Sequence, residues 1–462
     1  MNIKKEEGQS RAEDKIKKDW TKGSIARNLM LLSWPMVLME AIYMAGQIID
    51  MIWVGKLGPS AIAGVGIANI CILVIMSMDI GIIMGVRALI ARSTGSGDMR
   101  AANNITGQAI ILGSIWGLIV AVIGLIGTKA ILGLFGAETE VIKEGVAYLR
   151  IILVGWIAMM ILVMGMYSLQ ASGDTMKPMI IEFFIRTIHV VICPFLVLGY
   201  WIFPHLGAAG AAMSNVIAHT LGAVIVLCLL FSGRSRLKPS MSDFYSDLNI
   251  IWRILRIGIP AMVMHMQKSI GDMVLAWLII PFGTLAVAAH SLVLRVEMLF
   301  IAVGIGLGGG SGVLAGLNLG ANHPERAEKG GWVAAGIMEI FMIICSLVIM
   351  FKAETIIGIF TSEADLINLG SIFLRIAIAG YIMLGLVFVF QDCIAGTGDT
   401  IPTMIVSIAM IWVILLPLAF FLPGIFNLGV YGIRWAIVAS IIAGAIFYII
   451  YFMLGRWKLK KV

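Results

Sequence analysis

The chain has 462 residues, of which 60% are hydrophobic and only 13% are charged, whereas soluble domains average about 45–50% apolar and about 25% charged residues. This composition excludes a soluble globular protein and indicates an integral membrane protein. The formal net charge of +7 does not indicate nucleic-acid binding, because the cations gather in a few loops and tails and form no basic stripe interleaved with aromatic residues.

Apolar blocks long enough to cross a membrane recur along nearly the whole chain. A helix needs about 20 apolar residues to cross a hydrocarbon layer of about 30 Å, and it satisfies its own backbone polar groups there. Dividing the sequence at clusters of turn-forming and charged residues predicts twelve transmembrane helices, so the predicted fold class is an all-α integral membrane protein. The predicted spans are 29–55, 60–91, 104–128, 146–171, 178–204, 207–232, 252–281, 284–318, 330–351, 369–395, 402–425 and 429–455.

The charges of the loops predict how the spans are oriented. Cations gather before the first span, between the sixth and seventh, and after the last, whereas the opposite loops carry acids such as Glu138 and Glu363. Cations favour the cytoplasmic side, so both termini are expected in the cytoplasm and the protein in the cytoplasmic membrane. The predicted organisation is a charged tail 1–24, a first lobe 25–232, a cytoplasmic loop 233–250, a second lobe 251–456 and a basic tail 457–462.

One short polar motif occurs twice in the sequence. The stretch "QASGDTMKPM" at 170–179 returns as "IAGTGDTIPTM" at 394–404, and the offset is 399 − 174 = 225 residues. The same offset relates Pro35 to Pro260 and Gly95 to Gly320. The sequence therefore contains one six-helix unit twice, and both copies start on the same side of the membrane. Repeats of this kind are common in secondary transporters, with substrate and ion sites near the midplane between the halves.

Several motifs in a fixed order carry a family resemblance that covers about residues 25–455. They are "WPMVL" with "IIDMIWVGKLG", "GVRALIARSTGSGD", "LQASGDTMKP", "FGTLAVAAHSLVLRVE", "GLNLGANHPERA" and "IAGTGDT". Together they resemble the multidrug and toxic compound extrusion (MATE) family. The resemblance implies a V-shaped pair of six-helix lobes. It also implies exchange of external Na⁺ or H⁺ for the export of organic, often cationic and amphipathic, compounds.

Asp50 is the first candidate site residue, because a charge in hydrocarbon costs at least ~2.5–3.5 kcal/mol and needs a reason. It matches the family's aspartate in the first helix, which implies a carboxylate that binds H⁺ or Na⁺ and couples ion entry to export. The alternative is a structural carboxylate near the outer surface. Tyr43 and Gln47 on the same span are expected to contact substrate or support the site. Pro35 is expected to kink this helix by removing a backbone hydrogen bond.

The fifth span departs from the family pattern. Archaeal-type members resemble Asn-x-x-x-Asp-Pro there, whereas this chain has His189, three residues, Cys193 and then Pro194. Na⁺ is a hard ion that prefers oxygen ligands, so an oxygen-rich Na⁺ cage is in doubt and H⁺ is slightly favoured. Histidine titrates near neutral pH, which makes His189 a candidate coupling residue. The alternative is an ordinary core histidine.

The second lobe lacks the two carboxylates that some bacterial members of the family use. Those positions are Lys268 and Leu384 here, so a Na⁺ site of that kind is not expected. Lys268 and Asp272 are one helical turn apart and are expected either to form an ion pair or to bind substrate or protons. Glu297 is a candidate for ion coupling, and Arg295 beside it is a candidate for contact with substrate.

The sequence contains no Walker A, HExxH or GxSxG motif, so we expect a secondary active transporter and no enzyme. No cofactor and no metal are expected, and the cysteines are expected to be buried free thiols. The expected partners are the lipid bilayer and small organic substrates, and the expected state is a monomer. Two alternatives stay open: a lipid or lipid-linked oligosaccharide flippase, which Lys268 and Arg295 favour, and an intramembrane enzyme. The enzyme would use His189, His219, His265 or His290, which have no metal-ligand spacing.

Overall fold

The computed structural model describes residues 18–461 except 202 and 426, so most of the predicted tail 1–24 lies outside the described residues. Within them the chain is nearly all helical and has no strand, which confirms the all-α fold class. The main helices are α2 (Ile25–Gly55), α3 (Pro59–Gly95), α4 (Met99–Gly133), α5 (Thr139–Val154), α6 (Trp156–Ala171), α7 (Met176–Leu198), α8 (Ala208–Phe231), α9 (Leu248–Ile279), α10 (Thr284–Gly320), α11 (Pro324–Gly358), α12 (Ala364–Gly396), α13 (Thr400–Ile408), α14 (Leu416–Ile425) and α15 (Val430–Leu454). A π-helical segment, Ala409–Leu415, joins α13 to α14.

Ten helical segments of the described chain are long and apolar enough to cross a membrane. The pair α5 and α6, which is bent by 48°, makes an eleventh and corresponds to the predicted span 146–171. The remaining predicted span, 252–281, is α9, a helix of 32 residues whose polar side chains, Lys268 and Asp272 among them, make it less apolar than the others. All twelve predicted spans therefore correspond to helices, one of them bent.

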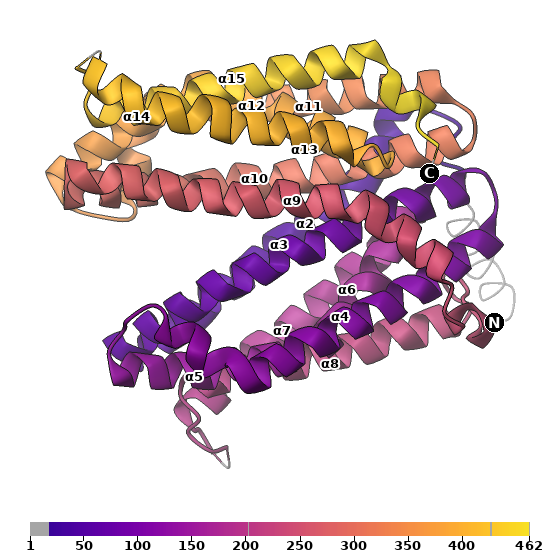
Figure 1. The fold of residues 1–462 in the computed structure, drawn as a ribbon, viewed down its shortest axis with the longest axis horizontal. Coiled ribbons are helices and arrows are strands. Elements are labelled where there is room, and N and C mark those ends of the chain that lie inside the picture. The colour runs from indigo at the N-terminus through magenta and orange to yellow at the C-terminus, as the bar shows by residue number, and fades with distance from the viewer. Residues whose placement is uncertain (1–17, 202, 426, 462) are drawn as a thin grey trace, which may run out of the picture.

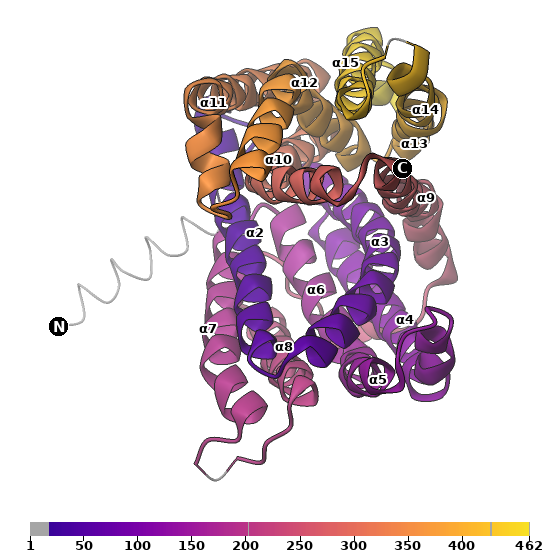
Figure 2. The same ribbon diagram turned by 90° about the vertical axis from the view of Figure 1, so that its left-hand side faces the viewer.

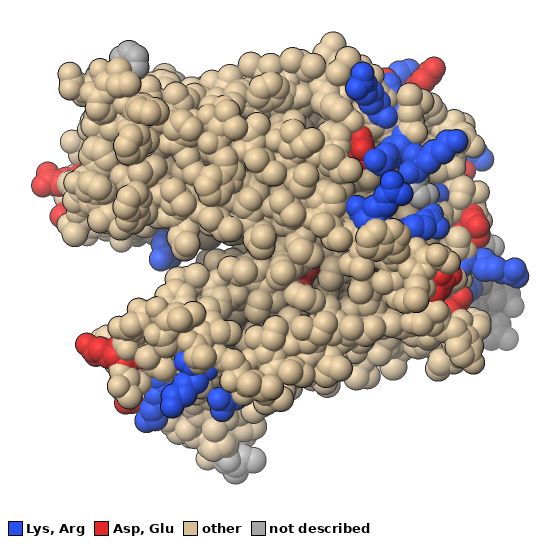
Figure 3. Space-filling model, viewed as in Figure 1, with Lys and Arg blue, Asp and Glu red and all other residues tan. Residues whose placement is uncertain are grey.

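The helices form two lobes. Helices α2 to α8 make one group and α9 to α15 the other, and α2 and α3 slope across to pack against α10 and α9 (Figures 1 and 2). The space-filling view shows a hollow between the lobes, open at one end of the molecule (Figure 3). Many Lys and Arg side chains gather at the opposite end, where α2 begins and α15 ends (Figures 1 and 3). We call this the basic end.

The helix boundaries repeat with the offset found in the sequence. Helix α3 runs from 59 to 95 and α10 from 284 to 320, and 284 − 59 and 320 − 95 are both 225. Helix α4 (99–133) matches α11 (324–358) in the same way. The pair α5–α6 covers 139–171 and α12 covers 364–396, again 225 residues apart. The internal duplication is therefore confirmed residue for residue over these elements.

Glycines allow the two lobes to touch where α3 crosses α10. A Cβ on Gly95 would lie 2.0 Å from the carbonyl oxygen of Leu317, and a Cβ on Gly320 would lie 2.1 Å from the carbonyl oxygen of Arg92. Because 317 − 92 and 320 − 95 both equal 225, this contact maps onto itself when the two repeats are exchanged. Backbones can approach this closely only where no side chain intervenes. The crossing therefore lies on the pseudo-twofold axis, toward the basic end of both helices.

The repeated Gly-Asp-Thr motif forms two equivalent turns at the basic end. Gly173 has φ 90° and Gly398 has φ 92°, a region that glycine adopts without steric cost. At the second turn, Asp399 accepts a hydrogen bond of 2.6 Å from Tyr451 and pairs with Lys460 at 3.3 Å. This turn therefore fixes the chain beyond α15.

The segment before α2 packs against the first Gly-Asp-Thr turn. Trp20 is only 8% exposed and lies so close to Gly173 that a Cβ there would be 2.2 Å from its Nε1 atom. Arg236, in the loop between the lobes, donates a hydrogen bond of 3.1 Å to the carbonyl of Lys18. The Thr21 hydroxyl donates to Asp19 at 2.6 Å and lowers the pKa of that carboxyl to about 2. Residues 18–24 are thus an ordered strap over the basic end.

Candidate functional site

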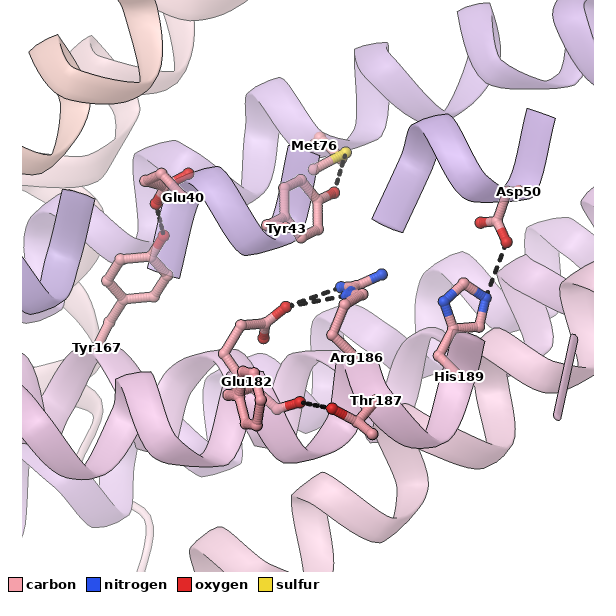
Figure 4. Close-up of polar contacts among 10 residues, drawn as sticks. Glu40, Tyr43, Asp50, Met76, Tyr167, Glu182, Arg186, Thr187 and His189 are labelled. Carbon is pink, nitrogen blue, oxygen red and sulfur yellow. Dashed lines mark hydrogen bonds and ion pairs between the residues drawn. The ribbon is translucent and has the colours of Figure 1, made fainter. Parts of the chain in front are cut away.

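Asp50 on α2 faces His189 and Cys193 on α7 (Figure 4). The spacing of four residues puts His189 and Cys193 on one face of their helix. The Nε2 atom of His189 lies 2.9 Å from Oδ1 of Asp50, and the Cys193 thiol donates to the same oxygen at 3.7 Å. The side chain of Asp50 is 15% exposed and that of His189 is 1% exposed. The candidate coupling residues of the first lobe therefore meet inside it.

The contact between His189 and Asp50 has the distance of an ion pair without the alignment of a hydrogen bond. Among the described residues, neither ring nitrogen of His189 has a hydrogen-bond partner, although both are buried. Buried polar groups are rarely left unpaired, because each one costs about 1–3 kcal/mol. An unpaired histidine next to a half-enclosed carboxylate is therefore a place where a ligand or ion would gain binding energy.

A second polar pair lies one to two turns away on α7. Arg186 donates to Glu182 at 2.9 and 3.2 Å, and both side chains are buried (Figure 4). The guanidinium of Arg186 lies 5.1 Å from the ring centroid of Tyr43, whose hydroxyl donates to Met76 at 3.7 Å. A Cβ on Gly46 would be 2.3 Å from Cδ of Arg186, so the glycine makes room for the arginine. Tyr43 thus supports a buried ion pair next to the Asp50 site.

Polar contacts continue from this site to the junction of the lobes. Tyr167 on α6 donates to Glu40 on α2 at 3.5 Å (Figure 4), and the guanidinium of Arg87 lies 5.8 Å from the Tyr167 ring centroid. Arg87, on α3, also donates to the carbonyl of Gly309 on α10 at 2.7 Å. Arg87 therefore links the polar interior of the first lobe directly to the second lobe.

Glu297 has a different partner from the neighbour that the sequence offers. Its carboxylate lies 3.1 Å from Arg434 on α15 and accepts a 2.8 Å hydrogen bond from Tyr381 on α12. Arg434, only 2% exposed, also lies 3.2 Å from Nδ1 of His290. Arg295, the sequence neighbour, is exposed on α10. The structure thus encloses Glu297 in a buried network that ties three helices together.

The other predicted residues lie apart from these clusters. No ion pair joins Lys268 to Asp272 in the part of the chain that the structure describes, and both side chains are exposed on α9. Gln47 is exposed on α2. Pro35 is buried, and α2 continues through it as one helix, so the kink stays a prediction.

Sequence reasoning missed three arginines, Arg87, Arg186 and Arg434. Each lies inside an apolar helix and makes the polar contacts described above. The signal was present in the sequence, since an arginine within a membrane span requires a partner just as a carboxylate does. Counting intramembrane cations together with intramembrane acids would have found all three.

Two helical lobes around an open hollow, each with ionisable residues enclosed in its interior, define a class of protein: the membrane transporters built from two repeats. The family model MatE matches residues 35–195 and 260–421, one match in each repeat, so the chain belongs to the MatE family and is a membrane transporter. The family expected from the sequence is confirmed.

Relatives and solved structures resemble the chain over almost its whole length. "Probable multidrug resistance protein NorM" of Thermotoga maritima is 25% identical over 446 residues, which cover 95% of this chain and 94% of that protein. The "FAD transporter" of Shewanella oneidensis is 23% identical and covers 86% of this chain and 87% of its own length. A MATE crystal structure in the straight conformation has a TM-score of 0.88 at 23% identity, and covers 95% of this chain and 96% of its own. A MOP superfamily transporter from Pyrococcus furiosus Vc1, described as having a binding pocket of reverse polarity, has a TM-score of 0.89 at 22% identity, with 96% and 98% covered. These structural likenesses show the fold.

Proposed function

We propose that the protein is a cation-coupled antiporter that exports organic, cationic and amphipathic compounds across the cytoplasmic membrane by alternating access. Asp50 binds the coupling ion, H⁺ or Na⁺, with H⁺ favoured because His189 and Cys193 offer no oxygen ligand. The names of the relatives from Thermotoga maritima and Bacillus subtilis, probable multidrug resistance proteins, support export of drug-like compounds.

The position of Asp50 carries this proposal. It is the acid on α2 that lies beside an unpaired buried histidine, while 15% of its side chain stays accessible. Glu182 and Glu297 are each paired with a buried arginine, which leaves them less able to bind a further cation. A carboxylate that is both enclosed and reachable can exchange its ion as the lobes move.

The orientation and the state of assembly belong to the same proposal. The basic end faces the cytoplasm, because cations favour that side, and the hollow then opens to the outside. The functional units are a first lobe 25–232 and a second lobe 251–456, joined by the cytoplasmic loop 233–250. A single chain contains both lobes and the hollow, so the protein acts as a monomer.

Transport into inside-out vesicles tests the proposal. Ethidium uptake is measured with an imposed pH gradient or Na⁺ gradient, for the wild type, for Asp50→Asn and for the matched control Asp365→Asn, an exposed residue of α12. We expect one gradient to drive uptake by the wild type and the control, and uptake by Asp50→Asn to fall to the level seen without a gradient. Full gradient-driven uptake by Asp50→Asn would show that Asp50 does not couple the ion.

A lipid or lipid-linked oligosaccharide flippase is the second candidate. The observation that favours it is the exposure of Lys268 on α9 and Arg295 on α10, two helices that border the hollow and could hold an anionic group there (Figures 1 and 3). A flippase would move fluorescent anionic lipid between leaflets of a proteoliposome and would leave ethidium where it is. Replacing both cations with glutamine would then abolish lipid movement.

A further inference from the structure

We propose that Asp50, His189 and Cys193 form a binding site for one borderline or soft divalent metal ion of the Zn²⁺ type. Their ligand atoms, one carboxylate oxygen, one ring nitrogen and one sulfur, all lie within 4.8 Å of one another. Within the described residues this is the one group of three such side chains that converges in this way. The proposal rests on the geometry of the site and holds whichever ion couples transport.

The distances fit a single bound ion. In a tetrahedral zinc site, ligand atoms about 2.0–2.3 Å from the metal lie roughly 3.4–3.6 Å from one another. Here Nε2 of His189 and Oδ1 of Asp50 are 2.9 Å apart, and Sγ of Cys193 and the same oxygen are 3.7 Å apart. The nitrogen and the oxygen must therefore separate by about 0.5 Å, which small side-chain rotations supply.

The unpaired histidine is the second observation. The side chain of His189 is 1% exposed and Cys193 is fully buried, yet neither ring nitrogen of His189 has a hydrogen-bond partner among the described residues. Two polar atoms that lie close together without hydrogen-bond alignment are arranged as two ligands that share a third atom. A metal ion supplies that atom.

The charge and the type of the ligands select the class of ion. Thiolate and imidazole ligands suit Zn²⁺ and its neighbours, whereas Na⁺, Mg²⁺ and Ca²⁺ prefer sites made of oxygen. When the metal binds, the Cys193 thiol releases its proton to water. The thiolate and the Asp50 carboxylate then cancel the charge of a divalent ion, so the filled site is neutral in the membrane interior. Asp50 is 15% exposed, which leaves a fourth position for water.

The consequence for transport is competition at Asp50. A bound metal occupies the carboxylate oxygen that the coupling ion needs, and it joins α2 to α7. Zn²⁺ should therefore inhibit transport, and the inhibition should depend on Cys193 and His189.

Absorption spectroscopy with Co²⁺ as the probe tests metal binding without transport. The full chain is purified in detergent without a histidine tag and titrated with Co²⁺. The wild type should bind one ion and show a sulfur-to-cobalt charge-transfer band with the visible bands of tetrahedral Co²⁺. Cys193→Ser should lose the charge-transfer band, and the matched control Cys228→Ser, an exposed cysteine of α8, should keep it. A wild type without the band, or a band that survives in Cys193→Ser, would overturn the proposal.

Histidine variants and transport complete the experiment. His189→Asn should weaken Co²⁺ binding at least about tenfold, whereas His205→Asn, an exposed histidine between α7 and α8, should bind as the wild type does. In vesicles, micromolar Zn²⁺ should inhibit ethidium uptake by the wild type, and Cys193→Ser should need at least about ten times more Zn²⁺ relative to its own metal-free rate. Equal inhibition of both proteins would contradict the proposal. Absence of gradient-driven uptake in metal-free wild type would count against the proposed function and would leave the spectroscopic result standing.

Discussion

The crossing of α3 and α10 should control how far the lobes can close at the basic end. A Cβ added at Gly95 would lie 2.0 Å from the carbonyl oxygen of Leu317, whereas ordinary contacts begin at 3.4 Å. Gly95→Ala must therefore move the helices apart by 3.4 − 2.0 = 1.4 Å, or distort one of them. Overpacking of this kind costs about 1–3 kcal/mol. If the cost falls only on the state that is closed at the basic end, its population relative to the open state drops by a factor of about 5–150.

The distance between the lobes at the basic end gives the measurement. Arg100 on α4 and Glu325 on α11 are exposed residues 225 positions apart, one in each repeat, and can carry spin labels as Arg100→Cys and Glu325→Cys. The three cysteines that are not buried, Cys71, Cys228 and Cys345, are first replaced with serine. Pulsed electron resonance should show a longer-distance population in Gly95→Ala that is absent from the parent protein.

A control on the same helix separates the clash from the general effect of alanine in a helix. Gly66 also lies on α3, and a Cβ there meets nothing within 4 Å. Gly66→Ala should leave the distance distribution of the parent unchanged. Gly320→Ala should act as Gly95→Ala does, because its Cβ would lie 2.1 Å from the carbonyl oxygen of Arg92. If Gly95→Ala and Gly66→Ala gave the same distribution, the crossing would not limit closure and the reasoning would be refuted.

Two further predictions concern stability, measured as thermal unfolding in detergent. Arg434→Met should destabilise the protein by about 3–5 kcal/mol because it leaves Glu297 buried without its partner, and adding Glu297→Gln should restore part of the loss; equal loss in the single and double variants would argue against a charge effect. Trp20→Ala should cost about 3–5 kcal/mol, because this side chain is 8% exposed, whereas Trp201→Ala, at a position 93% exposed, should cost little; similar effects of the two changes would show that the strap is not packed in solution.

The sequence predicted the elements well because their length is a local property. The membrane sets the minimum length of each span, and the 225-residue repeat fixes the order of the spans. The helices extend beyond the predicted spans, as α11 does at 324–358 against 330–351, because turns that leave the apolar layer stay helical. Hydropathy marks the membrane and does not mark the end of a helix.

The partners of buried charges were harder to predict because they depend on which helices become neighbours. Glu297 and Arg434 are 137 residues apart, and hydrophobic periodicity does not show that α10 lies beside α15 at that level. Lys268 and Asp272 stand at the ideal helical spacing, yet they do not pair in the described structure, because both are exposed and each has other orientations open to it. Spacing along one helix makes a pair possible and does not decide whether it forms.

The two repeats have kept their contact surface and changed their interiors. The crossing of α3 and α10 meets its own symmetry equivalent, so a bulky residue at Gly95 or Gly320 would spoil the same contact for both lobes. No such constraint acts on the interior of one lobe: the residue 225 positions after Asp50 is the buried Leu275, and the residue 225 positions before Glu297 is Ile72. An ion bound at Asp50 therefore has no counterpart in the second lobe. Occupation of that site changes the free energy of one lobe alone, while the shared crossing requires both lobes to move together, so one asymmetric binding event can shift the conformation of the whole transporter.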